Sequence, residues 1–234
     1  MKREMIGNCE LTCENCMELM ARYPDKHFDL AIIDPPYGIG ESMADFNSRN
    51  NNTGPHRIWK NPKPSRYIQK QWDSNKPDKT FFNELFRIAT NSIIFGANHF
   101  ISLIPFDSPC WIVWNKKTGD NDFADCELAW TSFNTAVRMF EWLWKGFAKE
   151  KPEERIHPTQ KPVALYKWLL SKYAKPGWKI LDTHLGSGSH AIACYDMGFS
   201  LTACEIDEDY FDAAIERLRL FASQGTLNFG ENND

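Results

Sequence analysis

The chain has 234 residues, enough for one large domain, and its 42% hydrophobic and 25% charged residues are ordinary for a globular protein. No apolar run approaches the roughly 20 residues that span a bilayer, and no signal peptide opens the chain, so we expect a cytoplasmic protein. The net charge of −4 argues against a protein that coats nucleic acid indiscriminately.

The positive charge is concentrated in one segment. Residues 56–79 hold seven Lys and Arg against two Asp, a local charge of +5, so the remainder of the chain carries −9. This asymmetry indicates one cationic surface that faces a polyanion.

The seven cysteines are expected to be free thiols, because their number is odd and nothing indicates secretion. Cys9, Cys13 and Cys16 lie close together, but no fourth ligand stands nearby, and structural zinc normally takes four ligands. We therefore expect no metal site.

The first elements in chain order form a strand–helix–strand pattern. Met5 and Ile6 indicate a short strand, residues 7–9 a turn, and the segment that follows a helix ending near Arg22. The apolar run 28–33 indicates a second strand. We expect the two strands to be parallel neighbours joined by a right-handed crossover.

The strand at 28–33 ends in Asp34-Pro35-Pro36-Tyr37. Two consecutive prolines cannot continue a strand ladder, so Asp34 ends the strand and Tyr37 lies on the turn beyond it. The carboxylate and the proline carbonyls supply acceptors, and Tyr37 supplies a flat face. The turn suits a planar heterocycle with an exocyclic amino group, although a structural turn with a capping Asp and a core Tyr is the alternative.

Residues 38–79 form a long polar segment, which is typical of a functional lid or a disordered loop. Trp59, Tyr67 and Trp72 alternate with its basic residues, a mixture that suits phosphate contact and base stacking. We expect an inserted nucleic-acid-contact loop rather than a merely solvated one. Its expected contact residues are Arg57, Trp59, Lys60, Lys63, Arg66 and Lys70.

The middle of the chain combines one amphipathic helix with short apolar runs. The helix is expected over 81–90, strands over 92–96, 110–114 and 127–133, and a candidate strand over 137–144. Residues 145–156 are polar and charged, so the stretch 134–156 is a candidate for a small recognition element.

The last third of the chain predicts a nucleoside-binding unit. Its expected elements are a turn at 157–162, a helix at 163–173, a strand at 178–182, a glycine-rich turn at 183–189, a helix at 190–197, a strand at 201–205 and a helix at 210–223. Both strands end in an acid, and Glu205 is placed to accept from two ribose hydroxyls. No Lys-Ser/Thr follows the glycines, which argues against a triphosphate loop.

Together these motifs resemble the S-adenosylmethionine-dependent DNA amino-methyltransferases in the permuted β-class order, in which Asp-Pro-Pro-Tyr precedes the glycine-rich motif. Asp34 to Tyr37 match the catalytic motif, Asp182 to Ser189 the cofactor loop, and Glu205 the ribose-binding acid. The resemblance covers nearly the whole chain. It implies an α/β fold, a Rossmann-like three-layer sandwich with a mostly parallel mixed sheet, circularly permuted within a single domain (1–234).

The resemblance also implies site residues. His157 to Pro162 resembles the turn that grips the methionine end of the cofactor, and Gly7-Asn8-Cys9 the turn near its adenine. The expected catalytic residues are Asp34, Pro35, Pro36 and Tyr37. The expected residues that bind S-adenosyl-L-methionine are Asn8, Cys9, Asp34, Thr159, Gln160, Lys161, Asp182, His184, Gly186, Ser187, Gly188 and Glu205.

Two positions depart from the family pattern: His184 stands where the family usually has Phe, and Asn8 where it usually has Asp. Both bear on cofactor affinity and not on the reaction class. Asp before Pro-Pro-Tyr, rather than Ser, resembles the adenine-modifying branch, so we expect an adenine-N6 methyltransferase that acts on double-stranded DNA. Cytosine-N4, RNA or a protein amide as substrate, and a non-catalytic binding module, remain alternatives.

Dimerisation is common in this family, and the sequence does not decide whether this chain forms a homodimer. It leaves equally open the target sequence and a role in restriction, in a phage or in chromosome marking.

Overall fold

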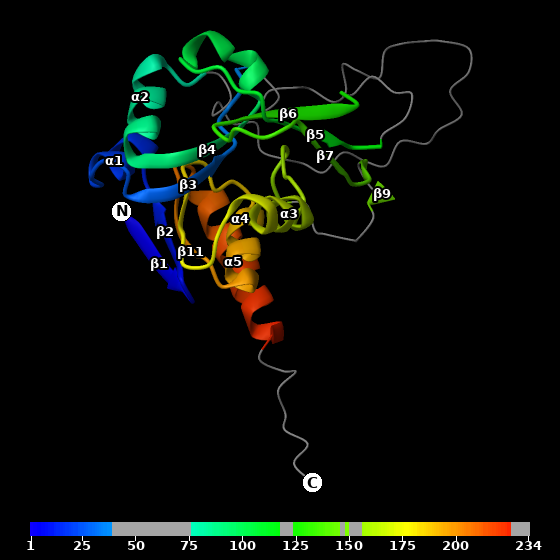
Figure 1. The fold of residues 1–234 in the computed structure, drawn as a ribbon. Coiled ribbons are helices and arrows are strands. Elements are labelled where there is room, and N and C mark those ends of the chain that lie inside the picture. Colours follow the sequence, from blue (N-terminus) through cyan, green and yellow to red (C-terminus); the bar gives the residue numbers. More distant parts are fainter. Residues whose placement is uncertain (39–75, 118–123, 146–147, 150–155, 226–234) are drawn as a thin grey trace, which may run out of the picture.

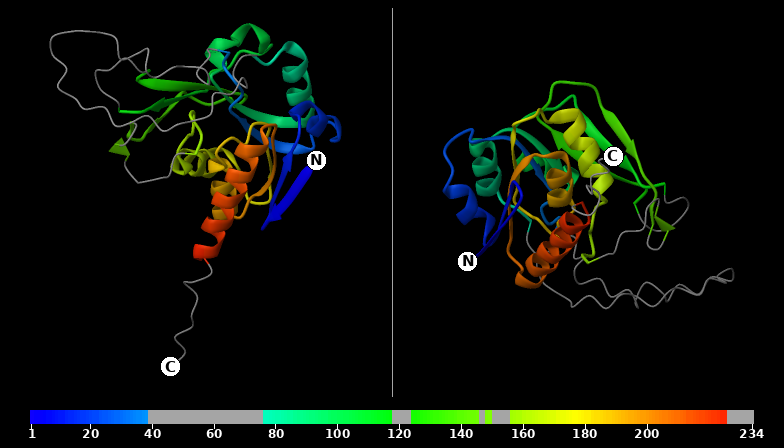
Figure 2. Two further views of the ribbon diagram at one scale, coloured as in Figure 1. Left: turned by 180° about the vertical axis from the view of Figure 1, so that it is seen from behind. Right: turned by 90° about the horizontal axis from the view of Figure 1, so that it is seen from below.

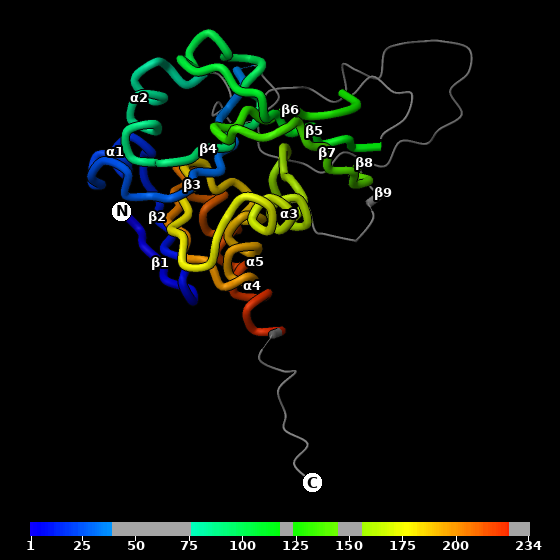
Figure 3. The backbone as a smooth tube through the Cα atoms, in the orientation of Figure 1, coloured from blue at the N-terminus to red at the C-terminus, as the bar shows by residue number. Residues whose placement is uncertain are grey.

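A computed structural model describes residues 1–38, 76–117, 124–145, 148–149 and 156–225. Most described strands form one sheet in the order β1-β2-β11-β10-β3-β4-β6-β5-β7 (Figure 1). They are β1 (Lys2–Ile6), β2 (Cys9–Cys13), β3 (Phe28–Ile33), β4 (Ala89–Phe95), β5 (Trp111–Asn115), β6 (Cys126–Thr131), β7 (Arg138–Glu141), β10 (Lys179–Asp182) and β11 (Ser200–Glu205). A separate hairpin, β8 (Trp144–Lys145) with β9 (Ala148–Lys149), lies beyond β7 (Figure 3).

Helices cover both faces of the sheet and make three layers (Figures 1 and 2). The described helices are α1 (Cys16–Ala21), α2 (Lys79–Ile88), α3 (Val163–Tyr173), α4 (Ser189–Met197) and α5 (Glu208–Gly225), with short 3₁₀ turns at Ala97–His99 and Ile101–Leu103. One apolar core lies between the sheet and α1 and α2, and another between the sheet and α3, α4 and α5. The predicted Rossmann-like α/β sandwich is confirmed.

The sheet is mixed but mostly parallel. β2, β11, β10, β3 and β4 run parallel, and the antiparallel pairs lie toward the two edges, where β1 pairs with β2 and β6 pairs with β4 and β5. The strands β3, β10 and β11 are almost wholly buried because helices cover them on both sides. No described helix has both the length and the apolar character needed to cross a bilayer.

The N-terminal prediction was wrong in its pairing. The chain forms a hairpin, β1–β2, across Gly7, whose φ of +56° suits glycine and where a Cβ would lie 2.7 Å from the Tyr195 ring. The strand before α1 is therefore β2, and its parallel neighbour is β11 rather than β3. β10 and β11 take the central positions because both of their faces are apolar, whereas β1 is largely exposed and suits an edge.

Most other predicted elements are present with shifted ends. The Asp78 side chain accepts a hydrogen bond from the Phe81 backbone N–H at 2.9 Å and so starts α2 at Lys79. α2 ends at Ile88 and the chain continues directly into β4. The candidate strand at 137–144 divides into β7 and β8. These two strands and β9 lie in the stretch 134–156 that was considered as a recognition element.

The topology gathers several loops at one edge of the sheet. β2, β11, β10 and β3 run parallel, so the residues that follow their carboxyl ends meet there. These residues are Glu14 after β2, Asp34 after β3, Thr183 after β10 and Ile206 after β11. The candidate site lies at this edge.

Candidate active site

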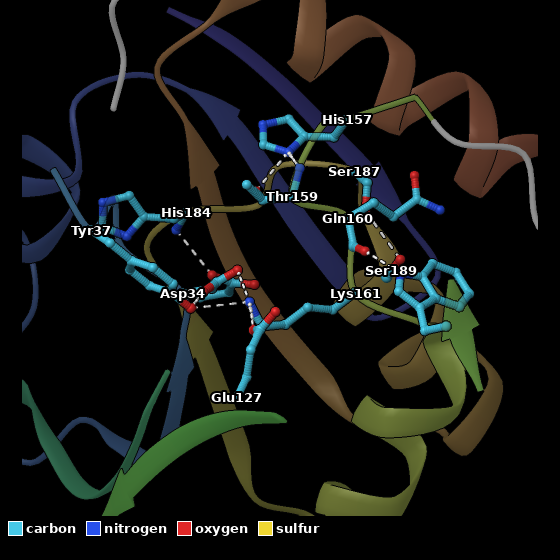
Figure 4. A network of polar contacts seen from close by, with 12 residues as sticks. Asp34, Tyr37, Glu127, His157, Thr159, Gln160, Lys161, His184, Ser187 and Ser189 are labelled. Atoms are coloured by element: carbon cyan, nitrogen blue, oxygen red, sulfur yellow. Dashed lines mark hydrogen bonds and ion pairs between the residues drawn. The ribbon is translucent and has the colours of Figure 1, made fainter. Parts of the chain in front are cut away.

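The Asp-Pro-Pro-Tyr turn is held rigidly. Asp34 directly follows β3, as predicted, and its Oδ1 accepts a hydrogen bond from the Tyr37 hydroxyl at 2.7 Å (Figure 4). The Tyr37 ring stacks on His99 with centroids 5.0 Å apart and an angle of 15° between the planes. It also packs on Gly96, where an added Cβ would lie 2.0 Å from the ring, so only glycine fits there. The carboxylate and the aromatic ring are thus preorganised.

Asp34 also contacts a buried lysine from the second half of the chain. The Lys161 ammonium lies 2.5 Å from Asp34 Oδ2 and 3.0 Å from Glu127 Oε2, and it donates to the Tyr37 hydroxyl at 3.3 Å (Figure 4). Lys116 lies 2.5 Å from the other Glu127 oxygen. Sequence analysis missed Glu127 and Lys116. The signal for Glu127 was a carboxylate inside an otherwise apolar strand.

The two carboxylates around Lys161 have unlike proton affinities. Burial raises the pKa of Asp34, and the ammonium of Lys161 opposes that rise without reversing it. Burial also acts to raise the pKa of Glu127, but two ammonium groups prevail and hold that pKa at about 2. The pKa of Lys161 is raised, because the two carboxylates outweigh its burial. Glu127 and Lys161 therefore stay charged at neutral pH, and Asp34 is the carboxylate that takes up a proton more readily.

The glycine-rich turn after β10 is shaped by backbone hydrogen bonds to acids. Asp182 Oδ1 accepts from the His184 backbone N–H, and its Oδ2 lies 2.9 Å from His190 Nδ1. The two oxygens of Glu205 accept from the backbone N–H groups of Gly186 at 2.9 Å and Asp207 at 3.0 Å. Each carboxylate oxygen has a further lone pair, so Glu205 can also accept from ligand hydroxyls.

The turn at 157–162 closes the site from the side of α3. His157 Nδ1 accepts from the Thr159 backbone N–H at 3.3 Å, and the Gln160 carbonyl accepts from Trp144 Nε1 at 3.0 Å. Gln160 is 3% exposed, so the turn is anchored by burial as well as by hydrogen bonds. This anchoring places Lys161 against Asp34.

One cavity of about 600 Å³ joins these parts. Predicted site residues in its wall are Asp34, Pro36, Thr159, Gln160, Lys161, His184, Gly186, Ser187 and Glu205. Lining residues outside the predicted motifs include Asn15, Met17, Phe81 and Tyr166. His157 and Thr183, which lie in the predicted cofactor motifs, also line the cavity. The cavity therefore contains a carboxylate with a rigid aromatic neighbour at one end and an acid with a glycine-rich turn at the other.

Other predicted residues lie behind the wall or away from it. Pro35 and Tyr37 support Asp34, Asp182 holds the glycine-rich turn, and Gly188, at a φ of +72°, begins α4. The six predicted DNA contacts, Arg57, Trp59, Lys60, Lys63, Arg66 and Lys70, lie outside the described residues.

The placement of Asn8 and Cys9 at the cofactor was wrong. Cys9 pairs with Leu201 at the start of β11, whereas the cavity lies at the other end of that strand, by Glu205. The turn that reaches the cavity from β2 is Glu14-Asn15-Cys16. Asn15 caps α1, and its side chain accepts from the Met17 backbone N–H at 2.8 Å. The added hairpin strand displaced the predicted turn to the far end of the sheet.

Comparison with known proteins agrees with this geometry. Residues 106–216 match the family model of N6/N4 methyltransferases described as DNA methylase. Over this part of the chain, the sequence is therefore similar to the N6/N4 DNA methylases. It is 23% identical over 248 residues to the type II methyltransferase M.HpaI of Haemophilus parainfluenzae, which covers 89% of this chain and 73% of that protein.

Solved structures show the same fold. A crystal structure of the M1.HpyAVI–SAM complex matches with a TM-score of 0.55 and 19% identity, covering 89% of this chain and 99% of that one. PvuII DNA methyltransferase, described as cytosine-N4-specific, matches with a TM-score of 0.59 and 10% identity, covering 93% of this chain and 92% of that one. Both likenesses extend over about nine-tenths of this chain and show a shared fold.

Proposed function

We propose that the protein transfers a methyl group from S-adenosyl-L-methionine to the N6 amino group of adenine in double-stranded DNA. The observation that carries this proposal is the shared cavity, in which Asp34 and Glu205 line the same space. One carboxylate is available for an amino group and the other for ribose hydroxyls. The relation to the N6/N4 DNA methylases supports the reaction class.

The cofactor fits the glycine-rich end of the cavity. The second lone pairs of the Glu205 oxygens are placed for the ribose hydroxyls, and the Gly186 backbone allows close approach. Thr159 and Gln160 border the same space and suit the methionine end. The related M1.HpyAVI structure is described as a SAM complex, which supports this choice of cofactor. When bound, S-adenosylmethionine supplies an electrophilic methyl group on a sulfonium.

Asp34 activates the amino group. The lone pair of an exocyclic amine is delocalised into the ring, so the amine is a weak nucleophile. The Asp34 carboxylate and the Pro35 carbonyl each accept one N–H, which favours tetrahedral geometry and frees the lone pair. As the nitrogen–carbon bond forms and the sulfur–carbon bond breaks, the nitrogen becomes positive, and the preorganised carboxylate stabilises that charge. The proton then leaves the methylated amine, and Asp34, with its raised pKa, is placed to take it.

Tyr37 positions the base. An amino group inside a stacked duplex cannot reach Asp34, so the target base leaves the stack. The Tyr37 ring is braced by His99 and by its hydroxyl bond to Asp34. It does not line the cavity but is partly exposed, and we expect the extruded base to stack on its exposed part. Holding the amine in line with the methyl group supplies much of the rate enhancement.

Adenine is favoured over cytosine because the residue before Pro-Pro-Tyr is Asp34, as in the adenine-modifying branch that the sequence resembles. A cytosine-N4 amine needs the same two acceptors, and the fold likeness to PvuII DNA methyltransferase keeps that substrate as the second candidate. The direct test identifies the methylated nucleoside.

The test is incubation of the full chain with labelled S-adenosylmethionine and unmethylated duplex DNA, followed by nucleoside digestion and mass spectrometry. We expect N6-methyladenine, reduced on the order of 10³-fold or more in Asp34→Ala because the preorganised acceptor is lost. Asp34→Ala should keep most of its cofactor affinity, measured by calorimetry. Methylcytosine would overturn the base assignment, and no methylated nucleoside would overturn the proposal.

A further inference from the structure

Four charged side chains form a chain of alternating sign at the catalytic end of the cavity. They run Asp34, Lys161, Glu127 and Lys116. Asp34 and Lys161 come from segments far apart in the sequence, whereas Lys116 directly follows β5 and Glu127 lies on its partner strand β6. Figure 4 shows Glu127 and Asp34 on either side of the Lys161 ammonium. Glu127 and Lys116 have no part in the mechanism above.

We propose that Glu127 is a positioning residue for the methyl transfer: it anchors Lys161 and so sets the negative charge that Asp34 presents to the amino group. This inference rests on the proposed function.

The contacts of Lys161 carry the first step of the argument. Its ammonium donates hydrogen bonds to Asp34 Oδ2 and to the Tyr37 hydroxyl, and it forms an ion pair with Glu127 Oε2 at 3.0 Å. Its side chain is 3% exposed, so the loss of an ionic partner leaves a largely buried ammonium with one carboxylate fewer. Without the Glu127 carboxylate, Lys161 has only Asp34 as a charged partner, and it binds that carboxylate more strongly.

Charge balance carries the second step. Asp34 must accept from the amine and stabilise the positive charge that develops on it, and an ammonium 2.5 Å away opposes this stabilisation. Glu127 offsets that ammonium at 3.0 Å. Lys116, bound to the far oxygen of Glu127, holds this second carboxylate in place. Asp34, Lys161 and Glu127 together thus carry one net negative charge when ionised, although Asp34 is paired with a lysine.

The proton affinities agree with this division of roles. Glu127 stays ionised throughout the neutral range because its pKa is about 2. Its negative charge acts to raise the pKa of Asp34, and Lys161 acts to lower it. Removing Glu127 and removing Lys161 should therefore shift the titration of Asp34 in opposite directions.

Other ionisable groups lie near Asp34. Among the described residues these are Tyr37 on its own turn, Tyr166 on α3, Asp182 at the end of β10 and His99 behind Tyr37. Burial raises the pKa of both tyrosines well above 10, so they stay neutral at the pH of the assay. Asp182 has its own partner in His190. Among the described residues, Lys161 is therefore the charged group in direct contact with Asp34, and Glu127 contacts Lys161 in turn.

The test compares Glu127→Gln and Lys161→Met with wild type in the pH dependence of kcat and in cofactor affinity. An opposite charge at this range typically moves a pKa by about one unit or more. For Glu127→Gln we expect kcat to fall about tenfold and the acidic limb to move about one pH unit lower. For Lys161→Met, the acidic limb of the kcat–pH profile should move to higher pH by a similar amount. A ¹³C titration of the Asp34 carboxyl, assigned with Asp34→Asn, should show the same opposite shifts without turnover.

Glu141→Gln is the matched control. It removes one carboxylate from the same sheet, but Glu141 is half exposed and pairs with Lys117 at 3.5 Å, so neither the limb nor the carboxyl titration should move. Loss of activity in Glu127→Gln with an unchanged Asp34 titration would overturn the inference, because it shows a structural role alone. A wild-type protein that methylates no DNA would overturn the proposed function, while the carboxyl titration would still decide whether Glu127 sets the charge of Asp34.

Discussion

The two ends of the cavity are built in different ways. At the glycine-rich end, Glu205 and Asp182 accept hydrogen bonds from backbone N–H groups within a short stretch of chain. At the catalytic end, Asp34, Glu127 and Lys161 meet as charged side chains from distant segments. The turn at 157–162 joins the ends, because Thr159 lines the first and Lys161 the second.

This difference separates affinity from rate. Backbone donors and a buried acid form a fixed outline that a nucleoside can fill before any reaction, so this end should govern cofactor binding. At the catalytic end, the charges of Asp34, Lys161 and Glu127 act on the positive charge that develops on the amine during methyl transfer. This end should therefore govern turnover. Substitutions at the two ends should therefore affect different kinetic constants.

Glu205→Gln should give the largest change in binding. A neutral amide replaces a charge-assisted acceptor worth roughly 1.5–3 kcal/mol, so we expect the Kd for S-adenosylmethionine to rise roughly 10- to 100-fold. At saturating cofactor, kcat should stay within about twofold, since uniform binding does not change the chemical step. Calorimetry and saturation kinetics measure both constants. Glu208→Gln, at an exposed site, is the control, and a fall in kcat at unchanged Kd would contradict the division between the ends.

Substitutions at Tyr37 should have a graded effect on turnover. Tyr37→Phe keeps the ring on His99 and loses the hydroxyl bond to Asp34, so kcat should fall about fivefold. Tyr37→Ala also removes the stacking surface, and the fall should reach roughly 10- to 100-fold. Single-turnover methylation of duplex DNA distinguishes the two. A larger defect in Tyr37→Phe than in Tyr37→Ala would argue against stacking.

His184→Phe should change stability more than chemistry. Burial lowers the pKa of His184 to about 4, so the folded protein holds it neutral while the unfolded chain takes up a proton below about pH 6.5. The unfolded state then binds more protons, and stability falls as the pH drops from 6.5 toward 4. Phe removes this dependence, so the loss of Tm between pH 7 and 5 should be a few degrees smaller in the variant. Plots of Tm against pH that run parallel for wild type and His184→Phe would contradict this expectation.

Patterns that depend on neighbouring residues were predicted well. The helix over 163–173 has its predicted ends, and Asp34 follows β3 as the two prolines required. The acids that end β10 and β11 both shape the glycine-rich turn. These features follow from apolar runs, proline and glycine, whose effects are local.

Patterns that depend on pairing were not predicted. The two residues Gly7-Asn8 between β1 and β2 are a hairpin signal that the prediction of a single strand did not use, and the hairpin moved Asn8 and Cys9 away from the cavity. The extra strand also placed Glu14-Asn15-Cys16 at the cavity edge. The order of the strands in the sheet depends on which strands have two apolar faces that helices can cover and which strands can remain exposed at an edge.

The sequence by itself determined the α/β fold class, the Asp34 turn and the glycine-rich turn with its two acids, because each is encoded within a few consecutive residues. Only the tertiary structure decided the strand order and the contact of Asp34 with Lys161, 127 positions away, and of both with Glu127. The sequence can mark a charged residue, as it does for Glu127 inside a largely apolar strand, but it does not mark the distant partner, since a charged residue is compatible with a solvated position until the fold buries it.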